Sequence, residues 1–196
     1  MAYFPMFVDL TNQPCLVVGG GQVAYRKVMT LLDFDAKVIV VAKDICENIS
    51  RMIEEKEYEI EVVRRTFEES DCDGKKLVIA ATDDEQLNHD ISQCCKARGI
   101  MVNAVDQKED CSFIFPSYVK EQELVAAFSS SGNSPVLTQY LKAKEKDILT
   151  PFLGELCEYM GSIREDIIHN YATEAQRRAV FKDIVDSAIK TGKLPE

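Results

Sequence analysis

The chain has 196 residues, of which 46% are hydrophobic, and its formal net charge is −10. This length is enough for one full domain with a smaller appendage, and the apolar content is enough for a packed core. The acidic charge argues against nucleic acid and anionic membrane surfaces as main partners. The chain has no run of about 18 apolar residues and no charged-then-apolar leader pattern, so we expect a cytoplasmic protein that does not associate with a membrane.

The candidate metal ligands with nitrogen or sulfur atoms are seven cysteines and two histidines. An odd number of cysteines without any Cys-x-x-Cys pair fits neither a disulfide framework nor a zinc site. We therefore expect the cysteines to be mostly reduced and to act as small apolar side chains, and we expect no permanently bound metal.

The chain begins with an apolar segment, residues 4–10, which could add an edge strand at a position that tolerates Pro5. Residues 15–18 then indicate a short buried strand, and three consecutive glycines follow it. Beyond the glycines, apolar side chains recur at helical spacing through residue 32. A strand, a glycine turn and a helix in this order are what a dinucleotide site requires.

Three small residues in this stretch match the Gly-x-Gly-x-x-Gly/Ala fingerprint of dinucleotide-binding proteins. Gly19 would make the tight turn, Gly21 would let the backbone approach a pyrophosphate, and Ala24 would let the helix pack closely on the strand. The unpaired N–H groups and the positive dipole end of the helix would face the phosphates. The alternative is a glycine-rich turn in some other parallel sheet.

A second buried strand is predicted over residues 37–42. The link before it has no glycine, so Asp35 is the residue there that best tolerates a left-handed backbone. Lys43 and Asp44 follow at the strand end, where an acid would bind the adenine ribose of NAD. Lys43 would equally suit the 2′-phosphate of NADP, so the residues alone only lean towards NAD.

The next segments continue the alternation of helices and strands. A charged helix covers about residues 44–56, a more exposed edge strand covers 60–65, and a buried strand covers 76–82. Small residues at the end of this buried strand leave room for a ligand, and Thr82 or Asp83 would cap the helix that follows. A plain helix cap without a ligand is the alternative.

A fifth strand over residues 100–105 places Asp106 at its carboxyl end. The alternation from residue 15 to this point predicts a parallel, doubly wound sheet with a ligand crevice beyond the carboxyl ends of its strands. Asp106 is therefore expected near the glycine turn. The alternative is that Asp106 only caps the turn after the strand.

The alternation stops near residue 112, which indicates a second, smaller unit. Strand-like runs at 112–116 and 124–129 flank the charged residues 120–123. Residues 129–135 concentrate hydroxyl and amide groups just before a helix, and this loop could hold an anion or serve as a connector. Three helical segments follow: one from residue 136, one over 149–168 and one over 173–189.

Five motifs stand in order along the chain: GGGQVAYRK at 19–27, AATDD at 80–84, NAVD at 103–106, SFIFP at 112–116 and SSGNSP at 130–135. In this order and spacing, over roughly residues 3–170, they resemble the precorrin-2 dehydrogenase/sirohydrochlorin ferrochelatase family, the dehydrogenase part of siroheme synthases. The family oxidises precorrin-2 to sirohydrochlorin with NAD as the hydride acceptor. Its bifunctional members then insert ferrous iron, which is a substrate, to give siroheme.

The resemblance implies an α/β fold with three parts. These are a Rossmann-type NAD-binding domain over residues 1–111, a small α+β dimerisation domain over 112–147 and a C-terminal helical domain over 148–196. The family assembles as an intertwined homodimer, so a second copy of the chain and the tetrapyrrole are the expected partners.

The resemblance also implies a set of site residues. Asp106 would handle protons in both reactions, and the tetrapyrrole would face Ser130, Ser131 and Asn133. Cofactor contacts would come from three loops, at Gly19, Gly21, Gln22, Val23, Lys43, Asp44, Thr82 and Asp83. Because the substrate is polyanionic and the protein is acidic, we also expect a local positive rim made by Lys120, Lys142, Lys144 or Lys146.

Two other functions remain open. The protein could be a dehydrogenase only, with iron insertion left to a separate protein. It could also be a nucleotide-sensing module of the kind that regulates transporters. Such a module would share the glycine turn but would need neither the NAVD motif nor the serine-rich loop.

Overall fold

The computed structural model describes residues 3–55 and 58–195. The chain divides into two compact units, and the division falls between Phe115 and Pro116. The first unit contains strands β1 (Pro14–Val18), β2 (Lys37–Val41), β3 (Ile60–Val63), β4 (Leu77–Ala80) and β5 (Met101–Ala104), helices α1 (Gln22–Leu32), α2 (Glu47–Glu55) and α3 (Glu85–Ala97), and the 3₁₀ turns η1 (Glu69–Cys72) and η2 (Lys108–Asp110).

The five strands of the first unit form one parallel sheet in the order β3-β2-β1-β4-β5. Val18 at the end of β1 is paired with Val41 of β2 and Ala80 of β4, and Ala80 is paired with Ala104 of β5. The carboxyl ends of β1, β2, β4 and β5 therefore lie side by side along one edge of the sheet. This is the doubly wound α/β fold that the alternation predicted, with β3 at one edge of the sheet.

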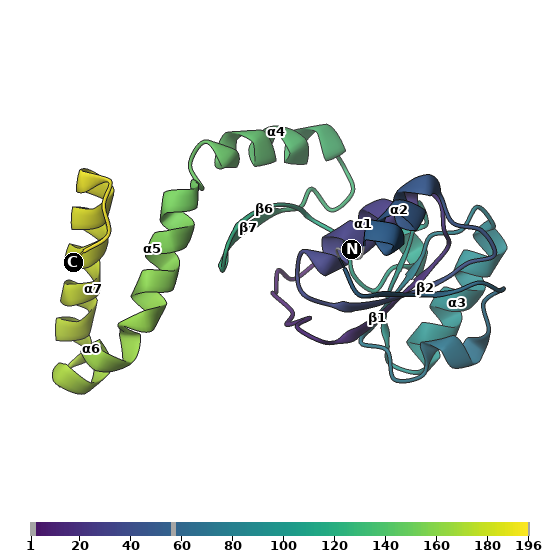
Figure 1. Ribbon diagram of the computed structural model, residues 1–196, viewed down its shortest axis with the longest axis horizontal. Coiled ribbons are helices and arrows are strands. Elements are labelled where there is room, and N and C mark those ends of the chain that lie inside the picture. Colours follow the sequence, from purple (N-terminus) through teal and green to yellow (C-terminus); the bar gives the residue numbers. More distant parts are fainter. Residues whose placement is uncertain (1–2, 56–57, 196) are drawn as a thin grey trace. The chain divides into compact units, whose positions relative to one another are not determined.

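Helices cover both faces of this sheet (Figure 1). Helices α1 and α2 pack on the face that carries Cys15 and Val17, whereas α3 packs on the face that carries Leu16 and Val18. Because successive residues of a strand point to opposite faces, a strand covered on both sides needs an uninterrupted apolar run. Residues 15–18 provide that run and are almost fully buried.

Two predicted strands do not form. Residues 4–10 are outside any strand, and Phe4 and Phe7 are 84% and 76% exposed, so no buried apolar face holds this segment on a sheet. Residues 112–116 are also not a strand. In this segment the Asn103 side chain donates to the Phe113 carbonyl at 3.0 Å, and the Ser112 amide donates to the Val102 carbonyl at 2.8 Å.

Two local predictions have different outcomes. Asp35 has a φ of 55°, so the left-handed residue lies where it was predicted. The cap of α3 was predicted wrongly, because the residue that caps it is Asp84, whose carboxylate accepts from the Leu87 amide at 3.0 Å. The Thr82 hydroxyl instead donates to the Asn88 side chain at 2.7 Å and accepts from the Asp84 amide at 3.2 Å.

Over residues 116–195 the second unit contains an antiparallel pair of strands and four helices. Residues 120 and 121 were predicted to lie between strands, but they belong to the first strand of this pair, and Gln122 makes the turn with a φ of 53°. The helix predicted over 149–168 is divided at Ile163. The elements are β6 (Ser117–Glu121), β7 (Leu124–Phe128), α4 (Pro135–Lys146), α5 (Pro151–Ser162), α6 (Arg164–Asn170) and α7 (Glu174–Thr191).

Residue chemistry explains where two of these helices begin. Ser134 caps α4 by accepting from the Leu137 amide, and Pro135 occupies the first turn, where its missing amide hydrogen costs nothing. Thr173 and Gln176 form a capping box at the start of α7. In the part of the chain that the structure describes, no helix combines the length and the apolar character needed to cross a membrane.

An ion pair between Arg65 and Asp71 makes the stability of the first unit depend on pH. The two guanidinium nitrogens of Arg65 lie 2.8 and 2.6 Å from the two Asp71 oxygens, and the Glu68 amide also donates to this carboxylate. The hydrogen bonds from Arg65 lower the pKa of Asp71 below its ordinary value. A carboxyl group with a lowered folded pKa stabilises the fold above its unfolded pKa of about 4, and this contribution is lost as the pH falls through the folded pKa.

We therefore expect Asp71→Asn to lower the urea midpoint of unfolding at pH 7. The difference from the wild type should shrink at acidic pH, where the wild-type carboxyl is itself protonated. Urea titrations at several pH values measure this. Glu123→Gln, an exposed change in the β6–β7 turn, is the control. A deficit of the same size at all pH values would contradict the assignment.

Candidate functional site

The glycine turn after β1 touches the loops that follow β2 and β4. Gly19 has a φ of 119°, and a Cβ at this position would lie 2.2 Å from the Ala81 carbonyl oxygen. A Cβ on Gly20 would lie 2.0 Å from the Asp44 carbonyl oxygen. Both contacts are with backbone that cannot move aside, so both positions require glycine. The fingerprint predicted the turn at Gly19, but the close approach at Gly20 was missed, and its only signal was the run of three glycines.

The start of α1 is suited to a phosphate. A Cβ on Gly21 would meet no atom within 4 Å, so this residue borders open space. Within the described residues, no side chain caps this helix and its first turn has no acid, whereas Asp84 caps α3. The free amides and the positive dipole end are therefore available to an anion, and the absent Cβ leaves room for it. A dinucleotide pyrophosphate fits this arrangement.

The loop after β2 closes one side of this region. The Cys46 amide donates to the Gly20 carbonyl at 2.7 Å, and the Asn48 side chain donates to that of Gln22 at 3.1 Å. Lys43 and Asp44 follow β2 and are both exposed, and Val23 is half-buried in the first turn of α1. The residues predicted to contact the adenosine thus lie on the loop that packs against the glycine turn.

Thr82 is held rigidly beside the glycine turn. Its amide and hydroxyl both bond to the buried Asn88 carboxamide oxygen, at 3.1 and 2.7 Å, and the Asn88 amide nitrogen donates back to the Thr82 carbonyl at 3.1 Å. Asp83, the next residue, is exposed. Because Asn88 uses the Thr82 hydroxyl, Thr82 can offer a ligand mainly a fixed surface.

Asp106 lies at the carboxyl end of β5. Its φ is 60°, and the preceding residue, Val105, donates its amide to the Ala80 carbonyl at 2.9 Å. The Asp106 side chain is exposed, and within residues 3–55 and 58–195 its carboxylate makes no hydrogen bond or ion pair. Asp and Asn tolerate this left-handed conformation better than other residues with a side chain. The carboxylate is therefore free to accept a proton from a ligand.

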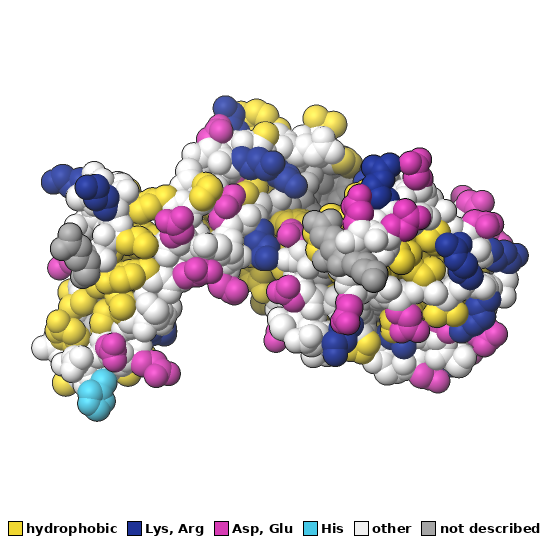
Figure 2. All heavy atoms as spheres, in the orientation of Figure 1, with side chains coloured by type: hydrophobic (Ala, Val, Ile, Leu, Met, Phe, Trp, Pro, Cys, Tyr) yellow, Lys and Arg dark blue, Asp and Glu magenta, His cyan; other side chains and the backbone are white. Residues whose placement is uncertain are grey.

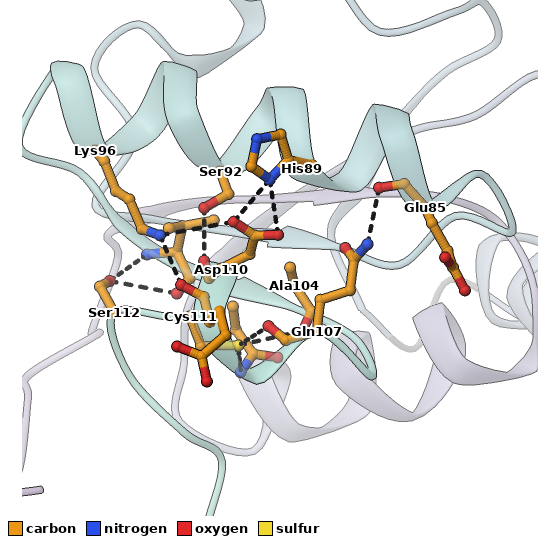
Figure 3. Close-up of polar contacts among 12 residues, drawn as sticks. Glu85, His89, Ser92, Lys96, Ala104, Gln107, Asp110, Cys111 and Ser112 are labelled. Atoms are coloured by element: carbon orange, nitrogen blue, oxygen red, sulfur yellow. Dashed lines mark hydrogen bonds and ion pairs between the residues drawn. The ribbon is translucent and has the colours of Figure 1, made fainter. Parts of the chain in front are cut away.

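Side-chain contacts hold the loop that carries Asp106 on helix α3 (Figure 3). The Gln107 side chain donates to the Glu85 carbonyl at 2.8 Å. The buried Asp110 carboxylate lies 3.0 Å from His89 Nδ1 through each of its oxygens, and 3.8 Å from the Lys96 ammonium. Ser92 adds a hydrogen bond from its hydroxyl to the Asp110 carbonyl at 2.6 Å.

These α3 residues share one face of the helix because they recur at spacings of three and four. Asn88, which holds Thr82, comes from the neighbouring position. One helix therefore fixes both the loop after β4 and the loop after β5. The sequence analysis missed this function of α3, because hydrogen bonds between a helix and a loop some 20 residues away leave no local pattern.

Asp110→Asn should loosen the Asp106 loop, because it removes the charge that His89 and Lys96 surround. We expect a loss of about 1–3 kcal/mol in the free energy of unfolding, the usual cost of a broken hydrogen bond to a buried charged group. Chemical denaturation measures it. Glu109→Gln, an adjacent exposed acid, is the control. Equal stability of both variants would show that the buried carboxylate does not anchor the loop.

The serine-rich loop belongs to the second unit, between β7 and α4. Ser131 and Gly132 both have positive φ values, of 55° and 83°. The Ser134 amide donates to the Ser130 hydroxyl at 2.9 Å, and the Asn133 amide donates to the Ser130 carbonyl at 3.0 Å. The loop is thus an ordered turn, and the Ser131 side chain is half-buried while that of Asn133 is exposed.

The structure brings the predicted cofactor positions and Asp106 together along the carboxyl ends of the parallel strands. The glycine turn follows β1, and Lys43 and Asp44 follow β2. Thr82 and Asp83 follow β4, and Asp106 follows β5. A doubly wound sheet with a glycine turn and an uncapped helix at this edge defines a dinucleotide-binding domain of the Rossmann class. The family model described as "Putative NAD(P)-binding" matches residues 6–117. The chain belongs to this NAD(P)-binding family.

Curated relatives extend the likeness to the whole chain. The siroheme synthase of Sodalis glossinidius (strain morsitans) is 40% identical over 200 residues, and that of Vesicomyosocius okutanii subsp. Calyptogena okutanii (strain HA) is 35% identical over 200 residues. Each match covers 100% of this chain and 42% of the relative. The chain therefore spans less than half the length of these relatives, and the resemblance to siroheme synthases is confirmed.

A solved structure titled "SirC, precorrin-2 dehydrogenase" has the same fold. It superposes with a TM-score of 0.81 at 24% sequence identity, and the match covers 95% of this chain and 91% of the other. The likeness thus includes the strands and helices after residue 115 as well as the parallel sheet. The predicted fold class is confirmed in both parts.

Proposed function

We propose that this protein is an NAD-dependent dehydrogenase that oxidises precorrin-2 to sirohydrochlorin in siroheme biosynthesis. The observation that carries the proposal is the shared edge of the sheet, where an open glycine turn follows β1 and the Asp106 carboxylate, which has no partner among the described residues, follows β5. The names of the relatives and of the similar solved structure support this choice of reaction.

The residues that would hold the dinucleotide follow from the contacts of the glycine turn. The backbone amides of Gln22 and Val23, at the uncapped start of α1, would bind the pyrophosphate. Lys43 and Asp44 would border the adenosine, and Thr82 and Asp83 the nicotinamide. When bound, NAD supplies the acceptor for the hydride that leaves the reduced macrocycle.

Asp106 is our proposed general base. The oxidation removes a hydride and a proton from neighbouring positions of the macrocycle, and the exposed carboxylate takes the proton. Loss of two pyrrole N–H protons accompanies entry of ferrous iron, so the same carboxylate would serve iron insertion. We therefore include ferrochelatase activity in the proposal, with iron as a substrate.

The second unit supports a homodimer and a tetrapyrrole contact in this proposal. Val136, Leu137 and Tyr140 on α4 are 76%, 52% and 58% exposed, and Figure 2 shows apolar side chains on the surface of this unit. A second copy of the chain would cover them. We propose the dimerisation domain over residues 112–147 and the helical domain over 148–196. Light scattering that finds only the 22.1 kDa monomer would contradict the dimer.

Ser130, Ser131 and Asn133 would face the tetrapyrrole in this assembly. Lys142, Lys144 and Lys146 on α4, with Lys120 on β6, would form the positive rim around it. The Lys142 ammonium lies 5.2 Å from the centroid of the Tyr118 ring, which steadies one member of the rim. A local positive rim offsets the repulsion between an acidic protein and a polyanionic substrate.

The test is a two-step assay on the purified chain. Precorrin-2 and NAD are added first, and NADH formation and the macrocycle spectrum are followed; ferrous iron is added afterwards. We expect NADH to form with sirohydrochlorin, and siroheme to appear after iron. NADH formation without siroheme above the no-enzyme control would show a dehydrogenase only. NAD binding without NADH formation would overturn the proposal and favour a nucleotide-sensing module.

A further inference from the structure

Lys27 on α1 reaches the segment that follows β5, the strand whose carboxyl end is followed by Asp106. Its ammonium stands 3.9 Å from the centroid of the Phe115 ring, and this ring packs against that of Phe113 with a centroid distance of 5.3 Å. Phe113 and Phe115 belong to the segment that returns from β5 over the face of the sheet covered by α1. The lysine stem is therefore fixed between α1 and this segment.

The ammonium has no anionic partner of its own. Within residues 3–55 and 58–195, Lys27 makes no hydrogen bond or ion pair, and its contact with Phe115 leaves its N–H donors unmatched. Burial lowers the pKa of Lys27, the Arg26 charge adds to this effect, and the Asp106 carboxylate opposes it. A partly buried, unpaired ammonium costs stability, since it loses hydration without gaining an acceptor. An anionic ligand would supply the missing acceptor.

The position of Lys27 favours the substrate over the cofactor. Lys27 is six residues beyond Gly21, which corresponds to about 9 Å along the helix axis from the proposed phosphate cradle. The ring that the ammonium contacts, that of Phe115, belongs to the segment that follows β5 rather than to the glycine turn. The anion that it meets is thus expected beside Asp106.

We propose that Lys27 is a substrate-binding residue, whose ammonium binds a peripheral carboxylate of the tetrapyrrole beside Asp106. The assignment rests on the proposed function. It adds a cation in the first unit to the lysine rim proposed on the second. The macrocycle would then be oriented by a carboxylate–ammonium contact next to the group that takes its proton.

The test compares Lys27→Met, Lys27→Gln and Lys27→Arg with Lys37→Gln. The control removes one positive charge from an exposed residue at the amino end of β2, opposite the site edge. The measurements for each variant are the KM for precorrin-2 with and without added salt, the Kd for NAD, and the thermal midpoint of unfolding. The Kd for uroporphyrin, a stable polycarboxylate porphyrin, is measured from the change in its fluorescence.

We expect Lys27→Met and Lys27→Gln to raise the KM and the porphyrin Kd by about tenfold, with the NAD Kd unchanged. Lys27→Arg should restore most of the affinity, and Lys37→Gln should behave as the wild type. The thermal midpoint of Lys27→Met should equal or exceed the wild-type value, because an unpaired buried charge is removed. Added salt should raise the wild-type KM more than that of Lys27→Met, because ion pairing is screened.

An unchanged KM and porphyrin Kd in folded Lys27→Gln would overturn the assignment, as would an increase confined to the NAD Kd. Failure of the proposed function looks different, because the wild type itself would then form no NADH with precorrin-2. The porphyrin titration still decides on Lys27 in that case. A wild type that binds no porphyrin overturns the assignment as well.

Discussion

Asp106→Asn is expected to lower kcat for precorrin-2 oxidation by about 10²- to 10⁴-fold, the usual contribution of a general base. Asparagine keeps the size of the side chain and also tolerates the left-handed backbone at φ 60°. The change therefore removes the proton acceptor and leaves the loop in place. Alanine would add about 1–2 kcal/mol of backbone strain, so a loss of activity could come from a displaced loop as well as from the missing base.

The measurements are the NADH assay, NAD binding and thermal unfolding. NAD affinity and the thermal midpoint should match the wild type, because the Asp106 carboxylate makes no hydrogen bond or ion pair within the described residues. Siroheme formation from supplied sirohydrochlorin should fall too if the same carboxylate serves iron insertion. Wild-type kcat in both reactions would rule out Asp106 as the base.

The second large effect is a contrast between two glycines of the same turn. Gly21→Ala should leave the fold intact, because its φ of −80° is ordinary and the added Cβ meets no atom within 4 Å. The methyl group would instead point into the space proposed for the pyrophosphate. We expect the NAD Kd to rise by about tenfold or more, with a change in unfolding free energy within about 0.5 kcal/mol.

Gly19→Ala should act on folding instead. Its φ of 119° is strained for any side chain, and the new Cβ would lie 2.2 Å from the Ala81 carbonyl oxygen. We expect a loss of about 3 kcal/mol or more in unfolding free energy, measured by urea denaturation. If Gly21→Ala binds NAD as tightly as the wild type, the phosphate cradle is not at this turn. Equal stability of Gly19→Ala would contradict the backbone contact.

The candidate site shows which inferences the sequence supports. The fingerprint at residues 19–24 and the strand ending at Asp106 could be found because each depends on a short pattern and on the rule that parallel strands share a carboxyl edge. Gly20, Asp110 and Lys27 could not be found in this way. Each gains its meaning from a contact with a segment distant along the chain.

The wrong predictions for residues 112–116 and for the charged residues after them have the same explanation. Residues 112–116 have strand-like composition, but the Phe113 carbonyl accepts from a side chain, that of Asn103, and the segment belongs to no strand. Charged residues predicted to separate two strands instead belong to β6, because in the hairpin Lys120 lies opposite Val125. A strand needs a partner as well as a suitable composition, and the partner is a tertiary property.

The amino-acid sequence by itself determined the alternating α/β architecture, the left-handed residue at Asp35 and a helix that begins close to Pro135. These features follow from periodicity and from steric rules that act within a few residues. Only the tertiary structure decided that α3 holds the loops of Thr82 and Asp106, and that the Lys27 ammonium lies over the Phe115 ring, on the segment that follows β5. Those arrangements depend on which distant groups folding brings within hydrogen-bonding or electrostatic range, and no local pattern encodes that.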